Sequence, residues 1–155
     1  MVVFMNHRWC CGNGDMDIVK KIRIVVVDDH AAMRQCLTAM VNAAADMEVV
    51  ANAPNGALAV ELVKEIVPDV VLMDINMPVM DGIEASRRII EFGAGVEIVL
   101  VSASFSEYTV SEYVDLPIKG FVEKARAGSQ LLNAIRSVMK GERYIRGMGD
   151  LKAVG

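Results

Sequence analysis

Five short apolar runs recur along the chain, separated by segments whose apolar residues repeat at helical spacing. Each run is rich in Val, Ile or Leu and is followed by polar residues, which is typical of buried strands. The expected strands cover about residues 22–27, 47–52, 69–73, 96–101 and 118–122. Because the runs are apolar rather than alternating, both faces of these strands are expected to be buried.

The remaining segments predict five helices. Asn55 and Asp81 are expected N-caps, and Ser104 with Glu107 has the spacing of a capping box. The expected helices are 31–44, one from Gly56 to Pro68, one from Asp81 to about Phe92, one after Ser104, and one from Gly128 or Ser129 to Gly141. This alternation predicts an α/β fold: a doubly wound, flavodoxin-like parallel sheet of five strands in the order 2-1-3-4-5, with five helices.

The same alternation predicts one domain at 21–141, an N-terminal tail at 1–20 and a C-terminal tail at 142–155. His7 and the pair Cys10 and Cys11 in the first tail are three candidate metal ligands without a fourth. We therefore expect no metal site in that tail.

Composition restricts the function further. The chain has 155 residues, 54% of them hydrophobic, and a net charge of −4, so it can build one core but carries no basic stripe for nucleic acid. No apolar run approaches the roughly 20 residues of a transmembrane helix. Three cysteines form no disulfide framework. We expect a cytoplasmic location and no direct nucleic-acid or membrane partner.

Polar side chains stand where the expected strands end. Asp28 and Asp29 follow the first strand, Asp74 the third, Ser102 the fourth and Lys124 the fifth. In an open parallel sheet these ends share one edge, where ligands bind. Carboxylates at close range repel each other unless a cation joins them, and Mg²⁺ takes such oxygen ligands. This pattern predicts a magnesium-assisted phosphoryl site.

A carboxylate can attack phosphorus to give an acyl phosphate, and catalysis of that transfer is mostly positioning and charge neutralisation. In this interpretation Mg²⁺ on Asp29 and Asp74 serves one phosphoryl oxygen, and the Lys124 ammonium serves another. The Ser102 hydroxyl and main-chain N–H groups near Asn76 and Ala103 serve the rest.

These marks together resemble the receiver (CheY-like) domain of two-component response regulators, over roughly 21–141. The motifs are Asp28-Asp29, Asp74-Ile75-Asn76-Met77-Pro78-Val79-Met80-Asp81-Gly82, Ser102-Ala103 and Gly120-Phe121-Val122-Glu123-Lys124. Asp28-Asp29-His30 and residues 134–138 are most similar to the NarL/FixJ (LuxR-type) branch. The segment 114–121, with Pro117, departs from that branch.

The resemblance implies roles for individual residues. Asp74 is the phosphoacceptor, and the metal ligands are Asp28, Asp29, Asp74 and the backbone carbonyl of Asn76. Ser102, Ala103, Lys124 and Phe121 form the phosphate-binding and switch group, with Phe121 as the switch aromatic that turns inward. Side chains Asn76 and Ser104 tune dephosphorylation. The cofactor is Mg²⁺ or Mn²⁺.

The resemblance also implies partners. A sensor histidine kinase or a phosphotransfer protein supplies the phosphoryl group, and the face near the last two helices could support a phosphorylation-dependent homodimer. The chain would be a switch with autophosphorylation and autodephosphorylation activity rather than a metabolic enzyme. Only about fourteen residues follow Gly141, too few for the DNA-binding domain of that branch. The alternative is therefore a receiver fragment of a longer LuxR-type transcriptional regulator.

Two other classes are disfavoured. A phosphatase of the haloacid dehalogenase type needs a second Asp two residues after its nucleophile, where Asn76 stands. A flavodoxin-like cofactor binder needs a Gly-rich phosphate loop after its first strand, where Asp28 and Asp29 stand instead.

Overall fold

A computed structural model describes residues 20–104, 111 and 113–145. Its strands are β1 (Ile22–Val27), β2 (Met47–Ala53), β3 (Val70–Asp74), β4 (Glu97–Ser102), β5 (Gly120–Glu123) and β6 (Tyr144–Ile145). Its helices are α1 (Ala31–Asn42), α2 (Gly56–Ile66), α3 (Gly82–Phe92) and α5 (Ala127–Met139), with one 3-10 turn, η1 (Lys124–Arg126), before α5. The predicted doubly wound α/β class is confirmed.

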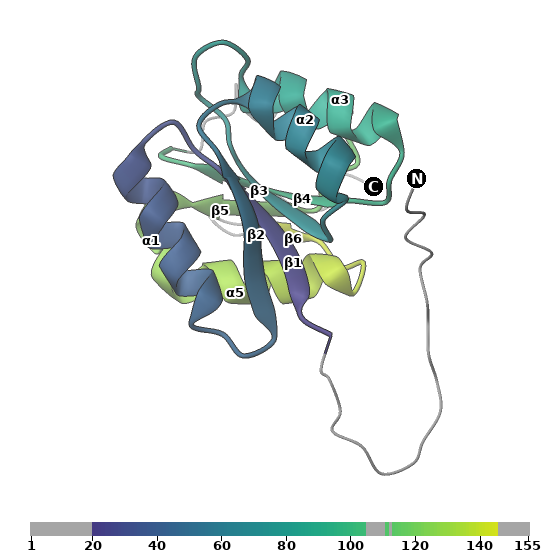
Figure 1. Cartoon of the computed structure of the whole chain (residues 1–155). Coiled ribbons are helices and arrows are strands. Elements are labelled where there is room, and N and C mark those ends of the chain that lie inside the picture. The colour runs from purple at the N-terminus through teal and green to yellow at the C-terminus, as the bar shows by residue number, and fades with distance from the viewer. Residues whose placement is uncertain (1–19, 105–110, 112, 146–155) are drawn as a thin grey trace.

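All the strands run parallel in a single sheet, in the order β2-β1-β3-β4-β5-β6. Among the described residues, α1 and α5 cover one face of the sheet and α2 and α3 the other (Figure 1). Strand order reverses between β1 and β3, the switch point at which ligands bind in such sheets.

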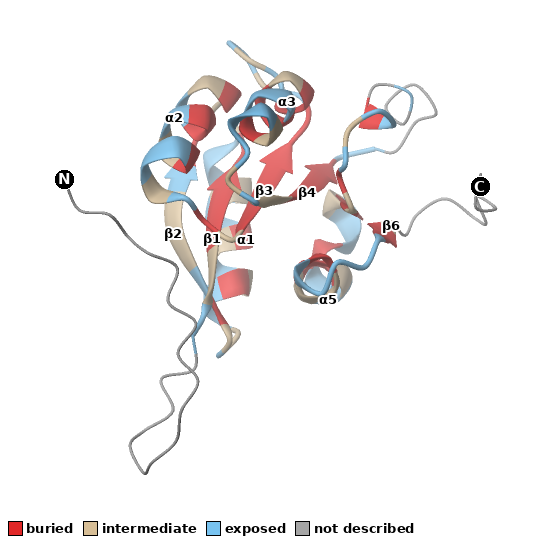
Figure 2. Cartoon of the chain, turned by 90° about the vertical axis from the view of Figure 1, so that its right-hand side faces the viewer, coloured by how far each residue is buried: buried red, intermediate tan, exposed pale blue. Residues whose placement is uncertain are grey.

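The core consists of two apolar layers, one on each face of the sheet. Neighbouring residues of a strand enter opposite layers: Val25 and Val27 pack under α2 and α3, whereas Ile24 and Val26 pack under α1 and α5. The central strands β1, β3 and β4 are accordingly buried over most of their length (Figure 2). This explains why the strands were continuous apolar runs in the sequence.

The counts of strands and helices differ from the prediction. We expected five strands, but Tyr144 and Ile145 form a sixth beside Gly120 and Phe121 of β5. Two residues are too few to give a periodic signal, and the edge of β5 supplies their hydrogen-bonding partner. The helix expected after Ser104 falls largely outside the described residues, which contain four α-helices.

The N-caps of α2 and α3 follow the predicted chemistry, whereas α1 and α5 begin without a side-chain cap, α5 at Ala127 rather than at Gly128 or Ser129. Asn55 accepts a hydrogen bond from the Leu58 N–H, and Asp81 accepts one from the Glu84 N–H, each at 2.9 Å. Each bond satisfies a backbone donor that the first helical turn leaves free.

None of the helices in the described part of the chain combines the length and apolarity that a membrane crossing requires.

Candidate functional site

The carboxyl edge of the sheet collects the acidic side chains. β1 and β3 are adjacent, with Val27 aligned to Met73, so the residues that follow Val27 emerge beside Asp74. Asp28 is fully buried and Asp74 nearly so, while Asp29 is partly exposed. The sheet topology therefore brings the three predicted carboxylates to one place.

Lys124 joins this cluster from the end of β5. Its Nζ atom lies 2.7 Å from Oδ2 of Asp28 and 3.1 Å from Oδ2 of Asp74, and its side chain is only 15% exposed. The ammonium thus neutralises part of the buried negative charge. The predicted phosphate-binding amine contacts two carboxylates in this structure.

Burial and charge shift the protonation of the pair. Burial, and then the charge of Asp28, raises the pKa of Asp74 against the opposing effect of Lys124. Burial alone would lower the pKa of Lys124, but its contacts with Asp28 and Asp74 outweigh burial and raise it. Lys124 therefore stays charged. Burial and Asp28 disfavour the ionised form of Asp74, and additional positive charge would stabilise that form.

The site fits a divalent cation. Asp28, Asp29, His30 and Asp74 each offer one ligand atom, and these atoms lie within 4.8 Å of one another. Oδ1 of Asp29 is buried and accepts no hydrogen bond from the described residues. Carboxylate oxygens in this arrangement are the hard ligands that Mg²⁺ prefers. Asn76 lies in the exposed loop after β3, and its carbonyl remains a predicted ligand.

The predicted switch residues lie on β4 and β5. Ser102 is buried, and its hydroxyl donates to the Ser104 carbonyl at 3.1 Å, while Ala103 and Ser104 are exposed. The Phe121 ring is buried and stacks on Tyr113, with centroids 6.2 Å apart. In this structure the hydroxyl contacts its own loop and the aromatic ring already points inward.

Two residues contact the site that sequence analysis did not assign to it. His30 Nδ1 lies 3.0 Å from Oδ1 of Asp29, and the Arg34 guanidinium donates to the Asp28 carbonyl at 2.7 Å. The sequence signal for His30 was its place directly after Asp28-Asp29. Arg34 had no such signal, because it lies in α1 and contacts the site only when the first turn of that helix is formed.

The loop between β3 and α3 is packed tightly against Asp74. The Gly82 N–H donates to the Ile75 carbonyl at 2.8 Å, and a Cβ atom on Gly82 would lie 2.0 Å from the Asp74 carbonyl oxygen. Only glycine permits this approach. The start of α3 thereby fixes the backbone that carries Asp74.

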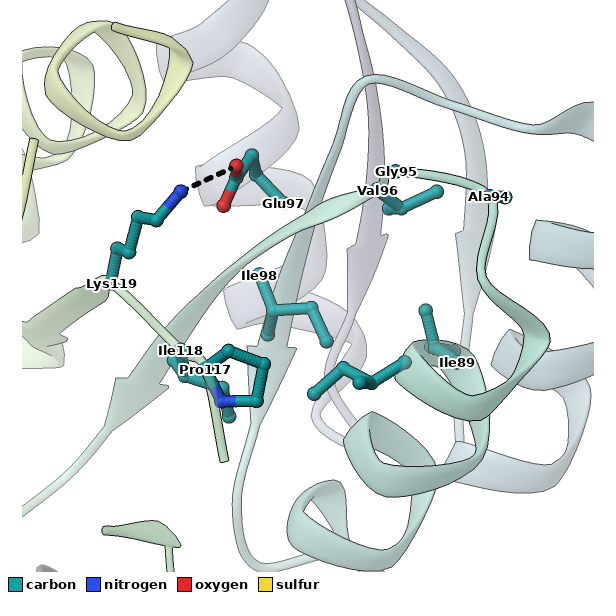
Figure 3. A pocket seen from close by; sticks show the side chains of 10 residues that line it. Ile89, Ala94, Gly95, Val96, Glu97, Ile98, Pro117, Ile118 and Lys119 are labelled. Atoms are coloured by element: carbon teal, nitrogen blue, oxygen red, sulfur yellow. Dashed lines mark hydrogen bonds and ion pairs between the residues drawn. The ribbon is translucent and has the colours of Figure 1, made fainter. Parts of the chain in front are cut away.

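A cavity of about 230 Å³ lies elsewhere, between the end of α3 and the segment that leads into β5. Apolar residues, among them Ile89, Ile98 and Pro117, line it, and the ion pair of Lys119 with Glu97 crosses its rim at 3.0 Å (Figure 3). Glu97 begins β4 and Lys119 precedes β5, so the cavity is at the amino edge of the sheet. It is separate from the acidic cluster.

Comparisons with known proteins agree with this geometry. The family model of the response regulator receiver domain matches residues 24–136. The chain is 36% identical over 125 residues to the transcriptional regulatory protein DegU of Brevibacillus brevis. The matched region covers 81% of this chain and 53% of DegU. The chain spans little more than half the length of the curated relatives it matches.

Solved structures show the same fold. The response regulator domain of Thermotoga maritima CheB has a TM-score of 0.73 at 32% identity, over 78% of this chain and 98% of that one. A LuxR-family two-component response regulator from Aurantimonas sp. SI85-9A1 has a TM-score of 0.76 at 28% identity, over 81% and 90% of the two chains.

Proposed function

Because this chain belongs to the response regulator receiver family, and so is a receiver domain of two-component signalling, we propose that Asp74 is its phosphoacceptor. The observation that carries the proposal is the triangle of Asp28, Asp74 and Lys124 at the carboxyl edge. It places a buried carboxylate nucleophile beside a fixed ammonium. The donor is a histidine kinase or a phosphotransfer protein.

In the proposed reaction an Asp74 carboxylate oxygen attacks the phosphorus of a phosphohistidine. The P–N bond breaks, its electron pair remains on the donor imidazole, and an acyl phosphate forms on Asp74. Lys124 lies 3.1 Å from the Asp74 carboxylate, so its charge is in position to offset the negative charge that gathers on the phosphoryl oxygens. Asp74 itself is held in place by β3 and by the approach of Gly82.

The proposed cofactor is Mg²⁺, or Mn²⁺, held by Asp28, Asp29, Asp74 and the Asn76 carbonyl. When bound, the cation supplies positive charge that neutralises the acidic cluster and the phosphoryl group. Oδ1 of Asp29 supports this assignment, because it is buried and accepts no hydrogen bond from the residues that the structure describes. Removing the cation should therefore abolish phosphorylation while leaving the fold intact.

The proposed response is a change of surface. A phosphoryl group on Asp74 would attract the Ser102 hydroxyl, which here donates to Ser104, and so would move the loop after β4. Phe121 lies on the neighbouring strand and packs against Tyr113, so that movement would reach the face of β5 and α5. Asn76 and Ser104 are exposed at the site, where they would tune the lifetime of the phosphate. The chain is thus a switch rather than a metabolic enzyme.

That altered face would recruit a second copy or another output partner, in the cytoplasm. A phosphorylation-dependent dimer should appear as a shift in sedimentation with a phosphoryl mimic. A monomer in both states would rule out the dimer without affecting the assignment of Asp74. The net charge of −4 supports a protein partner rather than direct contact with nucleic acid.

A second candidate is the receiver part of a longer LuxR-type transcriptional regulator. It is supported by relatives such as DegU, of which this chain covers 53%. A reading frame that continues into a helix-turn-helix domain would establish it. The chemistry proposed at Asp74 is the same in both cases.

Intact mass spectrometry tests the phosphoacceptor. Wild-type protein incubated with a small-molecule phosphodonor and Mg²⁺ should gain the mass of one phosphoryl group, and chelation of Mg²⁺ should prevent the gain. Asp74→Asn should gain nothing, whereas Asp115→Asn, at an exposed aspartate, should behave like wild type. An adduct on Asp74→Asn would refute the assignment.

A further inference from the structure

His30 brings a nitrogen atom to the acidic cluster. Its Nδ1 lies 3.0 Å from Oδ1 of Asp29 and 3.4 Å from Oδ1 of Asp28. The side chain is 71% exposed, so the ring lies at the mouth of the site, with Nδ1 toward the carboxylates. The three carboxylates of the cluster offer only oxygen.

The short contact between His30 and Asp29 lacks the geometry of a hydrogen bond. Oδ1 of Asp29 is buried and accepts no hydrogen bond from the described residues, although Nδ1 is 3.0 Å away. Adjacent ligands of an octahedral cation bound at about 2.1 Å lie about 3 Å apart. The spacing of Nδ1 and Oδ1 therefore suits two ligands of one shared cation.

Two hydrogen bonds fix the main chain of His30. The His30 N–H donates to Oδ1 of Asp28 at 2.9 Å, and the His30 carbonyl accepts the Arg34 N–H of the first turn of α1, also at 2.9 Å. Both ends of the residue are thus fixed, one by the cluster and the other by the helix. Because the main chain is held, only the side-chain torsions of His30 need to adjust for Nδ1 to act as a ligand.

We infer that His30 is a nitrogen ligand of the divalent cation at this site and that it shifts the metal preference from Mg²⁺ toward Mn²⁺ and Co²⁺. The inference rests on the cation site of the proposed function. Mg²⁺ favours oxygen ligands, whereas an imidazole nitrogen favours transition metals, with affinity rising from Mn²⁺ to Co²⁺. A receiver with oxygen ligands alone would discriminate less between Mg²⁺ and these transition metals.

Calorimetric titration of the metal-free, unphosphorylated protein with Mg²⁺, Mn²⁺ and Co²⁺ measures this preference. His30→Asn removes the nitrogen ligand and should weaken Co²⁺ binding by roughly tenfold or more, the scale on which metal sites respond to loss of a supporting group, while Mg²⁺ binding changes little. His7→Asn removes the other histidine of the chain and should match wild type.

Pulsed electron paramagnetic resonance of the Mn²⁺-loaded protein gives a direct second readout. Wild type and His7→Asn should both show nitrogen coupling from a bound imidazole, and His30→Asn should lose it. If Mg²⁺ binds but His30→Asn leaves the ratio of Co²⁺ to Mg²⁺ affinity unchanged, the role of His30 is overturned and the cation site stands. If no divalent cation binds the wild-type protein, both the proposed cation site and the role of His30 fail.

An equal gain in affinity for all three cations in His30→Asn would also overturn the inference. It would mean that His30 only competes with the cation as an ion-pair partner of the carboxylates. The ratio of affinities, rather than any single affinity, therefore decides the role of the residue.

Discussion

Asp74 carries a charge that its surroundings disfavour. Burial and the charge of Asp28 raise its pKa in spite of Lys124. A carboxyl group whose pKa is higher in the folded than in the unfolded chain binds its proton more tightly in the folded chain. Its ionisation therefore lowers the free energy of unfolding as the pH rises from the unfolded pKa through the folded pKa. We therefore expect Asp74→Asn to raise the free energy of unfolding at about pH 7 in a chelating buffer.

Urea denaturation at several pH values checks this expectation. The advantage of Asp74→Asn should shrink toward about pH 3, where the carboxyl group is protonated in both states. It should also shrink at neutral pH when Mg²⁺ is added, because the cation neutralises the wild-type carboxylate. Equal stability of the two proteins at pH 7 without metal would show that Lys124 alone compensates the charge.

At the scale of residues, sequence reasoning found the members of the cluster but not their contacts. The carboxylates were predictable because each follows a recognisable strand, and parallel strands end at one edge. The pairing of Lys124 with Asp28 was not, because it depends on how a long flexible side chain is oriented. The contact of His30 with Asp29 depends likewise on a side-chain rotamer that spacing does not encode.

At the scale of elements, the start of α3 limits what can stand beside Asp74. Gly82→Ala would place a Cβ atom 2.0 Å from the Asp74 carbonyl oxygen, so the loop must move. Overpacking of this kind costs about 1–3 kcal/mol, and we expect a loss near the upper end. The displaced Asp74 should also accept phosphate more slowly. Urea denaturation and the rate of phosphoryl adduct formation measure the two effects.

Gly128→Ala is the matched control for that prediction. Gly128 lies in α5, and a Cβ atom there would meet nothing within 4 Å. Alanine is favoured over glycine inside a helix by roughly 0.5–1 kcal/mol, so this variant should be slightly more stable than wild type. If Gly82→Ala were as stable as Gly128→Ala, the close approach to Asp74 would not constrain the loop.

The elements themselves were largely predictable. The strand expected at 22–27 has those bounds, and α2 and α3 begin directly after their predicted caps Asn55 and Asp81. These signals are local, since they depend on apolar runs and on side chains that bond the adjacent backbone. The last strand carries no local signal, because its pairing depends on β5, which lies more than twenty residues earlier.

At the scale of the whole molecule, β6 fastens the C-terminal segment to both layers of the core. Tyr144 packs in the layer under α5, and Ile145 packs against the layer that contains Phe121. Tyr144→Ala should lower the free energy of unfolding by about 2–3 kcal/mol, somewhat less than for a fully buried aromatic residue. Glu142→Ala, at an exposed neighbour, should change it little. Thermal or urea denaturation compares the two variants.

An unchanged stability of Tyr144→Ala would mean that the domain ends before β6. The predicted boundary near Gly141 would then describe the cooperative unit. The expected loss would instead place Tyr144 in that unit, although its stretch of sequence has no apolar periodicity.

The pairing of Ile145 with Phe121 also has a mechanical consequence. Tension on the chain beyond Ile145 would load a two-residue ladder, which can be pulled off the sheet edge in a single event. Loss of β6 would expose the edge of β5, the strand that contains Phe121 and is followed directly by Lys124. β5 therefore connects two features of the sheet: it pairs with β6 at one end, and at the other it leads into Lys124, which contacts Asp74. A pull on Ile145 would act on the same strand that positions Lys124.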